Sequence, residues 1–416
     1  MDQIKTAGII AEYNPFHNGH QYQIEEIRRQ TGADFVIVAM SGDFVQRGEP
    51  AIFDKYTRTR MALCGGADLV VELPALFATS SAEDFAACGV SLLSSLGTDF
   101  LCFGSESGNL SHLQKAAEIL SEESAIWQPL LQTYLKQGET YPSARSLAVA
   151  ELTGDPGFST LLATPNNILA VEYLKALKQQ GSSMIPVTIR RRGCGYHDTE
   201  FSGPYASASA IRLLLSQSAV LESTETLRMQ IPPAVFEALL EEGALTKPVF
   251  PDDLSELLQF RLLSAVQRQE DLSRFLDFSS DLAARLTRQV LHFAPFSEQI
   301  LQLKTKGYTY TRISRALLHL LLDITKEQSS QAKSLGYAPY ARILGFKKSA
   351  GPLLSHLRRQ SRIPLITKTA DAKKLLSPEA MKVLETDFYV SHIYQSLLAS
   401  HGRLMRNEYT KSVIVL

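Results

Sequence analysis

The first hundred residues alternate between short, uninterrupted apolar runs and longer segments in which apolar residues recur at helical spacing. The apolar runs have the length of buried strands, and they occupy 7–11, 35–40, 69–73 and 100–103. The segments between them carry helical periodicity with cap residues at their ends, and they cover 18–30, 54–63 and 82–95. Strands that alternate with helices predict a parallel sheet with helices on both faces.

Beyond this region the pattern is mostly helical. A fifth strand is expected at 184–189, and the last third of the chain shows helical spacing of apolar residues. Short strands expected at 341–346 and 363–366 would give that last part a small mixed end. We therefore predict an α/β fold with a Rossmann-like parallel-sheet domain at 1–225, followed by a mainly helical C-terminal domain at 250–416.

Composition is typical of a folded protein in a reducing compartment. The chain has 416 residues, of which 45% are hydrophobic and 20% charged, enough for one large or two ordinary domains. The first residues do not show the basic segment followed by an apolar segment that is typical of a secretory signal. No apolar run approaches the ~20 residues that a membrane span needs. The cysteines contain no CxxC pair, which excludes a zinc ribbon and argues against a disulfide scaffold. They are Cys64, Cys88, Cys102 and Cys194. We expect a cytoplasmic protein with no membrane partner.

Charge is distributed unevenly along the chain. Of 42 basic and 43 acidic residues, 19 basic but only 7 acidic residues follow position 300. Cations neutralise phosphates, and tyrosines interleaved with them can stack on unpaired bases. A solvated basic face is the alternative, but we favour an RNA-binding surface. Its candidate residues are Lys304, Lys306, Arg312, Arg315, Lys347 and Lys348.

The strongest chemical pattern lies in the turn after the first strand, where His17 and His20 bracket Gly19 at a helix N-terminus. In an open parallel sheet, ligands bind at the carboxyl ends of the strands. Gly19 lets a phosphate approach the free N–H groups of the first helical turn, and both imidazoles can donate to the same anion. The pattern favours phosphoryl or nucleotidyl transfer, which needs positioned donors more than a nucleophile. Two loop histidines that only cap and pack are the alternative.

This HxGH pattern resembles the signature of the nucleotidyltransferase superfamily, which shares a Rossmann-like fold with class I aminoacyl-tRNA synthetases. The segment from Ser207 to Arg212 is similar to the second signature of that superfamily. A longer set of ordered blocks resembles the tRNA(Met) cytidine acetate ligase family: GIIAEYNPFHNGH, MSGDFVQRGEPAIFDKYTRTRMAL, GADLVVELP, FGSE, PNNILAVEY and YHD. In the second half, KTKGYTYTRISRALLHLLL and ARILGFKK extend the resemblance.

The resemblance implies an ATP-dependent ligase that activates acetate as acetyl-adenylate in the first domain. The acetyl group would pass to the wobble cytidine of elongator tRNA(Met), held by the second domain, and give N4-acetylcytidine. Mg²⁺ is expected to accompany ATP, and His17 and His20 would be the catalytic residues. The residues that the resemblance assigns to ATP binding are Ala7, Gly8, Ile9, Ile10, Ala11, Glu12, Tyr13, Asn14, Pro15, Phe16, His17, Asn18, Gly19, His20, Gly104, Asn167, Arg191 and Arg192.

Several of these assignments have a structural alternative. Asn167 is chosen over Asn166, although a helix cap or an Asx-turn would explain it equally well. Three consecutive arginines leave the register of the arginine pair open by one residue. Ser207 and Ser209 can bind phosphate or cap a helix. Further basic residues are ranked lower, because solvated side chains are more common than phosphate ligands: Arg47, Lys55 and Arg58.

Two other functions stay open at this point. A nucleotidyltransferase that acts on a small phosphorylated substrate would explain HxGH and the serine-rich helix start, but not the long basic second half. A non-catalytic RNA-binding protein would explain the second half, but not the intact HxGH.

Overall fold

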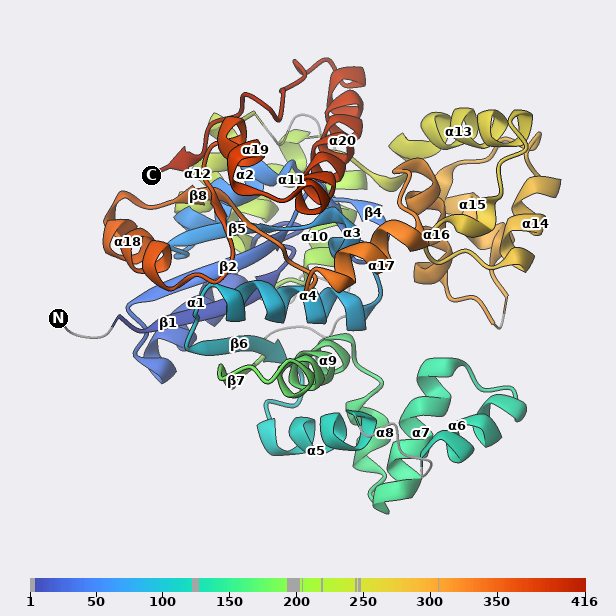
Figure 1. Ribbon diagram of the computed structural model, residues 1–416, viewed down its shortest axis with the longest axis horizontal. Helices are drawn as coiled ribbons and strands as arrows, with labels where there is room; N and C mark the ends of the chain where they lie inside the picture. The colour runs from blue at the N-terminus through green and yellow to red at the C-terminus, as the bar shows by residue number, and fades with distance from the viewer. Residues whose placement is uncertain are drawn as a thin grey trace.

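A computed structural model describes residues 4–121, 127–192, 203, 205–217, 220–243, 245, 248–305 and 307–416. Its main feature is a sheet in the order β10-β8-β5-β2-β1-β6-β7, with β9 paired to β8 (Figure 1). A small antiparallel ribbon of β3 and β4 follows β2. The strands are β1 Thr6–Ala11, β2 Phe35–Ser41, β3 Phe44–Val45, β4 Glu49–Pro50, β5 Leu69–Leu73, β6 Phe100–Ser105, β7 Ile185–Arg190, β8 Ala341–Phe346, β9 Leu365–Ile366 and β10 Ile414–Val415.

The five strands expected in the first half are all present and parallel to one another. β1 lies between β2 and β6 and pairs with both. β5 extends the sheet beyond β2, and β7 extends it beyond β6. The strand order therefore changes direction at β1. In open α/β sheets, this is the place where a crevice forms outside the carboxyl ends of the strands.

Apolar side chains on both faces of the strands explain the helical layers. In β1, Ala7 and Ile9 pack on one face and Ile10 on the other. The first face is covered by α1 Asn18–Thr31, α2 Lys55–Cys64, α10 Ala208–Gln217 and α12 Pro233–Glu241. The second face is covered by α4 Ala82–Ser95 and α9 Pro165–Gln179. Burial on both faces is the reason why these strands are continuous apolar runs in the sequence.

The remaining helices lie around this core (Figure 1). Between β6 and α9 the chain forms α5 Leu110–Ser121, α6 Trp127–Lys136, α7 Tyr141–Thr153 and α8 Gly157–Leu161. The others are α3 Ala75–Ala78, α11 Val220–Gln230, α13 Ser255–Gln267, α14 Ser280–Arg288, α15 Phe296–Leu303, α16 Tyr310–Leu321, α17 Lys326–Ser334, α18 Gly351–Gln360, α19 Ala372–Leu375 and α20 Pro378–Ser400. Among the described residues, no helix combines the length and apolar composition that crossing a membrane requires.

The C-terminal part returns to the sheet. β8 pairs antiparallel with β5, and β9 and β10 pair parallel with β8. The strand expected at 341–346 is confirmed, and the one expected at 363–366 is confirmed in part. The expectation that they form a small mixed end of a helical domain is wrong, because β8 covers the open edge of β5. The division into 1–225 and 250–416 stays a prediction, and the sheet takes strands from both ranges.

Candidate active site

The turn from β1 into α1 places the rings of His17 and His20 against each other. His17 is the N-cap of α1, and its Nδ1 accepts a hydrogen bond from Gly19 N at 3.0 Å. Nδ1 of His20 accepts from His17 N at 3.3 Å, which completes a reciprocal cap. The ring centroids lie 3.8 Å apart. Since both Nδ1 atoms accept from backbone N–H groups, the proton of each neutral ring lies on Nε2, which is then a donor.

Both imidazoles are neutral at physiological pH. Burial, reinforced by the charges of Arg191 and Arg212, lowers the pKa of His17 to about 3. Burial also lowers the pKa of His20 well below its usual range, and His17 and Arg191 act in the same direction. The histidine pair therefore supplies two fixed N–H donors, and the positive potential of the site comes from the arginines around it.

Gly19 has a packing role in this turn. A Cβ at this position would lie 2.9 Å from Cε1 of His17. A side chain would therefore push the imidazole out of its capping position. The sequence predicts that Gly19 lets a phosphate approach free N–H groups of the first helical turn. The structure differs, because Gly19 N donates to Nδ1 of His17, and His20 N and Gln21 N donate to His17 O. The small size of Gly19 instead leaves space for the ring of His17.

Most residues of the 7–16 segment support the turn from inside the protein. Oδ1 of Asn14 accepts a hydrogen bond from Ile52 N at 2.8 Å. The ring of Phe16 occupies the place where a Cβ of Gly65 would stand, so the turn packs directly on the end of α2. Within 7–20, the residues that line the pocket described next are His17, Gly19 and His20. Contacts of the other residues with ATP stay predictions.

A pocket opens beside the histidine pair, where β6 and β7 end and α1 and α10 begin. Its lining residues are His17, Gly19, His20, Tyr22, Gln23, Gly104, Ile189, Arg190, Arg191, Arg192, Tyr205, Ala206 and Ser207. The structure thus brings the predicted histidines, glycine and arginine pair to one place. Sequence reasoning missed Tyr22 and Gln23. They lie three and four residues after Gly19 in the same helix, and this spacing indicates that they share its face of the helix.

The arginine run begins with the last residue of β7, and all three of its members line this pocket. Burial lowers the pKa of Arg191, while Glu106 acts in the opposite direction. The guanidinium of Arg192 lies 4.3 Å from the ring centre of Tyr22. A Cβ on Gly104 would lie 3.5 Å from Cγ of Arg191, an ordinary contact. The protein itself therefore leaves room at Gly104, as expected of a residue beside a ligand.

The asparagines at the start of α9 shape the loop after β6. Oδ1 of Asn167 accepts hydrogen bonds from Glu106 N at 3.0 Å and from Ser107 N at 3.2 Å. Nδ2 of Asn166 donates to Oε1 of Glu106 at 2.6 Å. Neither asparagine belongs to the pocket lining. These contacts explain Asn167 as a loop-stabilising residue, and its contact with ATP stays a prediction.

The serine-rich start of α10 joins the histidine turn. Oγ of Ser207 accepts from Ala210 N at 3.1 Å, which is a capping contact, and the residue also lines the pocket. Arg212 donates from Nη1 to Asn14 O at 2.7 Å and from Nη2 to Ser209 Oγ at 3.2 Å. Arg212 therefore ties α10 to the turn and places a partly buried cation near His17. His197 and Asp198 of the YHD block lie outside the described residues.

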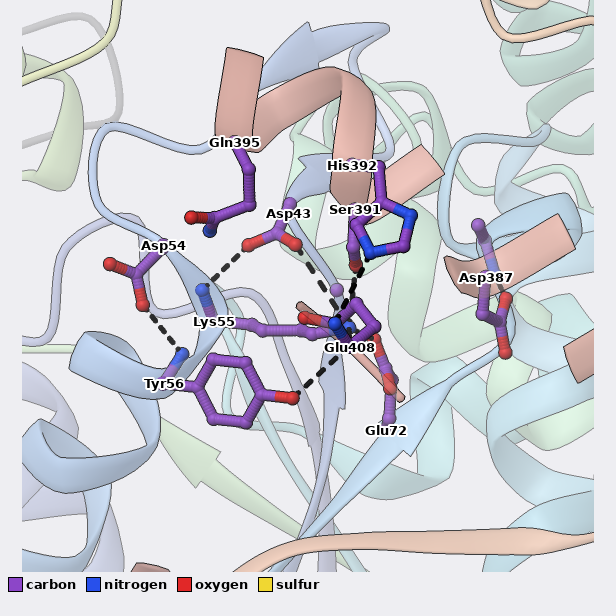
Figure 2. Close-up of polar contacts among 12 residues, drawn as sticks. Asp43, Asp54, Lys55, Tyr56, Glu72, Asp387, Ser391, His392, Gln395 and Glu408 are labelled. Atoms are coloured by element: carbon purple, nitrogen blue, oxygen red, sulfur yellow. Dashed lines mark hydrogen bonds and ion pairs between the residues drawn. The ribbon is translucent and has the colours of Figure 1, made fainter. Parts of the chain in front are cut away.

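Two of the lower-ranked basic residues are buried and hold the fold together. Nζ of Lys55 lies 2.7 Å from Glu72 Oε1 and 2.9 Å from Glu408 Oε2 (Figure 2). The guanidinium of Arg58 donates to backbone carbonyls at the ends of β1 and β2, those of Glu12, Ser41 and Gly42. Their charges are thus used within the protein and are not offered to a triphosphate.

Two of the residues expected to bind tRNA lie on the same edge of the sheet as the pocket. Lys304 follows α15 and is exposed, and Arg312 is partly exposed in the first turn of α16. α16 packs on the β3–β4 ribbon after β2, where Oγ of Ser314 donates to Gly48 O at 2.9 Å. α15 packs on α16, so Lys304 and Arg312 both belong to the helices on the pocket side of the sheet.

The other candidates for tRNA binding are placed differently. Arg315 is buried, and its Nε lies 2.8 Å from Oδ2 of Asp277, so its charge is paired inside the protein. Lys306 lies outside the described residues. Lys347 N donates to Asp68 O, directly before β5. Lys347 and Lys348 therefore lie at the amino edge of the parallel strands, opposite the pocket.

This fold and pocket define a HIGH-type nucleotidyltransferase. The chain matches the HIGH Nucleotidyl Transferase family over residues 4–408. Curated relatives named tRNA(Met) cytidine acetate ligase include one from Acetivibrio thermocellus, 37% identical over 99% of this chain and 100% of the relative. Another, from Thermoanaerobacter sp., is 41% identical over 93% and 94%. The chain belongs to the tRNA(Met) cytidine acetate ligase family and is a ligase.

Solved structures of Thermotoga maritima TmcAL resemble the whole chain. The apo form has a TM-score of 0.90 at 31% identity, and 99% of each chain is covered. The form bound with alpha-thio ATP has a TM-score of 0.88 at 30% identity, again over 99% of each chain. The fold of this family, a Rossmann-like sheet with many helices, is thus the fold that the sequence predicts.

Proposed function

We propose that this protein forms acetyl-adenylate from acetate and ATP in the cytoplasm. It then transfers the acetyl group to the wobble cytidine of elongator tRNA(Met), which becomes N4-acetylcytidine. The observation that carries this proposal is the stacked, neutral pair of His17 and His20 at the start of α1, beside an arginine-lined pocket. The names of the relatives and the ATP analogue bound by the Thermotoga maritima protein support it.

In the first step, a carboxylate oxygen of acetate attacks the α-phosphorus of ATP. The bond from this phosphorus to the bridging oxygen breaks, and pyrophosphate leaves with the electron pair. Charge grows on the phosphate oxygens, where Nε2–H of His17 and Nε2–H of His20 donate. Arg191 and Arg192 hold the outer phosphates as charge-assisted donors. No nucleophile of the enzyme takes part.

In the second step, the N4 amine of cytidine attacks the acetyl carbonyl carbon. The bond between this carbon and the phosphate oxygen breaks, AMP leaves with the electron pair, and the nitrogen loses a proton. The amine is weakly basic, so the enzyme contributes mainly by holding the anhydride and the base together while water is kept away.

Mg²⁺ belongs to this proposal as a companion of ATP. Among the residues that the structure describes, no group of three or more His, Cys, Asp or Glu side chains forms a metal site. The described lining of the pocket also contains no carboxylate. This donor set fits an ion carried by the phosphates of ATP, with the protein binding the remaining phosphate oxygens through histidine and arginine.

The tRNA partner would approach from the edge that carries the pocket. Lys304 and Arg312 are the candidates on that side, and Lys347 and Lys348 form a second basic site at the opposite edge. Arg315 leaves the set, because its guanidinium is paired with Asp277.

Exchange of labelled pyrophosphate into ATP, measured with and without acetate and tRNA, tests the proposal. Acetate-dependent exchange, followed by acetyl transfer to elongator tRNA(Met), is the expected result. Exchange that requires a small phosphorylated acceptor would show a different nucleotidyltransferase. RNA binding without any exchange would show a non-catalytic protein.

A further inference from the structure

A second, more open groove adjoins the nucleotide pocket on the outer side of α1. Its lining residues are Asn18, Gln21, Tyr22, Glu25 and Tyr205, and we name it the acceptor groove. Tyr22 and Tyr205 also line the nucleotide pocket, so the two spaces share a wall. We propose that the acceptor groove binds the cytosine base that receives the acetyl group, an inference that rests on the function proposed above.

The position of the groove suits the second step. Asn18, Gln21, Tyr22 and Glu25 follow one another at i, i+3, i+4 and i+7, so they share one face of α1. An α-helix rises about 1.5 Å per residue, which places Tyr22 about 6 Å from the N-terminus of the helix. The α-phosphate binds at that N-terminus in the proposed mechanism. A base in the groove is therefore within reach of an acetyl group on that phosphate.

The wall between the two spaces is suited to stacking. The rings of Tyr22 and Tyr205 lie 6.2 Å apart at 66°, and both side chains are partly exposed. The guanidinium of Arg192 lies against the ring of Tyr22 on the pocket side. Aromatic rings and arginine planes are the surfaces on which proteins stack unpaired bases. A wobble base in an anticodon loop is unpaired and can leave its stack at low cost.

The polar residues of the groove match cytosine. Nδ2 of Asn18 donates to Met229 O at 2.8 Å, which fixes one end of the groove. Gln21 and Glu25 line the groove but not the nucleotide pocket. A carboxylate accepts hydrogen bonds from the N4 amine of cytosine, and an amide can donate to N3 or O2. Uracil presents an oxygen where cytosine presents the amine, so Glu25 would reject it.

Substitution of the two residues outside the nucleotide pocket tests this inference. Glu25→Gln and Gln21→Ala are compared with Glu118→Gln, an exposed glutamate on α5. Each variant is assayed for acetate-dependent pyrophosphate exchange and for acetyl transfer to tRNA. We expect exchange to stay at the wild-type rate and kcat/KM for transfer to fall about tenfold in the two groove variants. Glu118→Gln should change neither reaction.

Competition experiments measure the preference for cytidine over uridine, which would not change if the groove residues had a purely structural role. Anticodon stem-loop RNA with cytidine at the wobble position is compared with the same RNA carrying uridine there, each as inhibitor of acetyl transfer. The wild type should prefer the cytidine RNA, and Glu25→Gln should lose most of this preference.

The possible outcomes separate the two proposals. If exchange in the wild type does not depend on acetate, the proposed function fails. If exchange is intact but neither groove variant changes transfer or base preference, the acceptor groove is wrongly assigned. If exchange and transfer fall together in both groove variants, the groove belongs to the ATP site and the inference is overturned.

Discussion

At the scale of single residues, the cap of α1 and the proposed catalysis use the same two side chains. Nδ1 of each histidine accepts a hydrogen bond from a backbone N–H of the turn, so the ring orientation and the tautomer are fixed before any ligand binds. Nε2–H is thereby preorganised, and no reorganisation is needed when charge develops on a phosphate. The low pKa of both rings fits this role as neutral donors.

His20→Ala removes one of these donors. We expect the rate of acetate-dependent pyrophosphate exchange to fall about 10²–10³-fold, the usual cost of losing one such donor. The affinity for tRNA should stay at the wild-type value, because the basic candidates lie on other elements. His112→Ala, at an exposed position of α5, serves as the matched control. Near-normal exchange in His20→Ala would refute the catalytic role.

The low pKa of His17 also predicts how stability depends on pH. Its folded pKa of about 3 lies below the unfolded value of 6.5, so the unfolded chain binds the proton more readily. Its contribution to stability is complete above pH 6.5 and is lost as the pH falls toward 3. His17→Asn retains a good N-cap residue without this proton site.

Urea midpoints between pH 7 and pH 4.5 measure this effect. The decline of the midpoint should be smaller in His17→Asn than in the wild type, and His112→Asn should decline like the wild type. An identical decline in His17→Asn and the wild type would show that His17 is not buried as a neutral ring.

Residues with a strong local motif could be predicted from the sequence, and residues defined by distant partners could not. His17, His20 and the arginine pair stand next to strand ends, so the pattern alone places them at the carboxyl edge. Arg315 looks like a surface cation in the sequence, because its partner Asp277 lies 38 residues earlier. Tyr205 comes into the pocket only because Arg212 of the following helix α10 is bonded to the histidine turn at Asn14 O, which no local pattern shows.

At the scale of elements, α2 is buried although its polar and basic sequence predicts an exposed helix. Its first turns read KYTRTR, yet every residue from Lys55 to Thr59 is buried. Lys55 and Arg342 face Glu72 and Glu408, so two cations meet two carboxylates in the interior. The nearby cations hold the pKa of Glu408 down to about 2 despite its burial. The cluster joins α2, β5, β8 and the C-terminal segment (Figure 2).

Lys55→Met breaks this cluster on the cationic side. We expect the free energy of unfolding to fall by about 3–5 kcal/mol, because Arg342 alone would then face two buried carboxylates and one negative charge would stay uncompensated. The double variant Lys55→Met/Glu408→Gln should lose less than the sum of the single variants, since it also removes the uncompensated negative charge. Arg29→Met, which breaks an exposed pair with Glu26, is the control and should leave the urea midpoint unchanged. Equal losses from Lys55→Met and Arg29→Met would contradict the role of the cluster.

At the scale of the whole molecule, the parallel half of the sheet could be predicted and its completion could not. Each parallel strand is followed by a covering helix, so the order of the pattern along the chain already indicates the architecture. The pairing of β8 with β5 joins 69–73 to 341–346, and an apolar run does not specify its partner. The consequence is functional: β8 carries Lys347 and Lys348 to the edge opposite the pocket, although the sequence suggests one basic surface.

The basic residues on the two edges of the sheet are expected to affect tRNA binding and acetyl transfer differently. Lys304→Ala/Arg312→Ala removes cations on the pocket side, and Lys347→Ala/Lys348→Ala removes cations on the far side. We expect the first double variant to weaken tRNA binding and to lower the slope of log K against log salt by about 1 for each phosphate that is no longer neutralised. It should also lower kcat/KM for acetyl transfer, while pyrophosphate exchange stays intact, because neither residue lines the nucleotide pocket.

The second double variant, Lys347→Ala/Lys348→Ala, should have the smaller effect on acetyl transfer, since its residues lie away from the reacting base. Filter binding at several salt concentrations, together with both activity assays, measures these effects. A larger decrease of transfer in the far-side variant would place the tRNA on the edge of the sheet opposite the pocket.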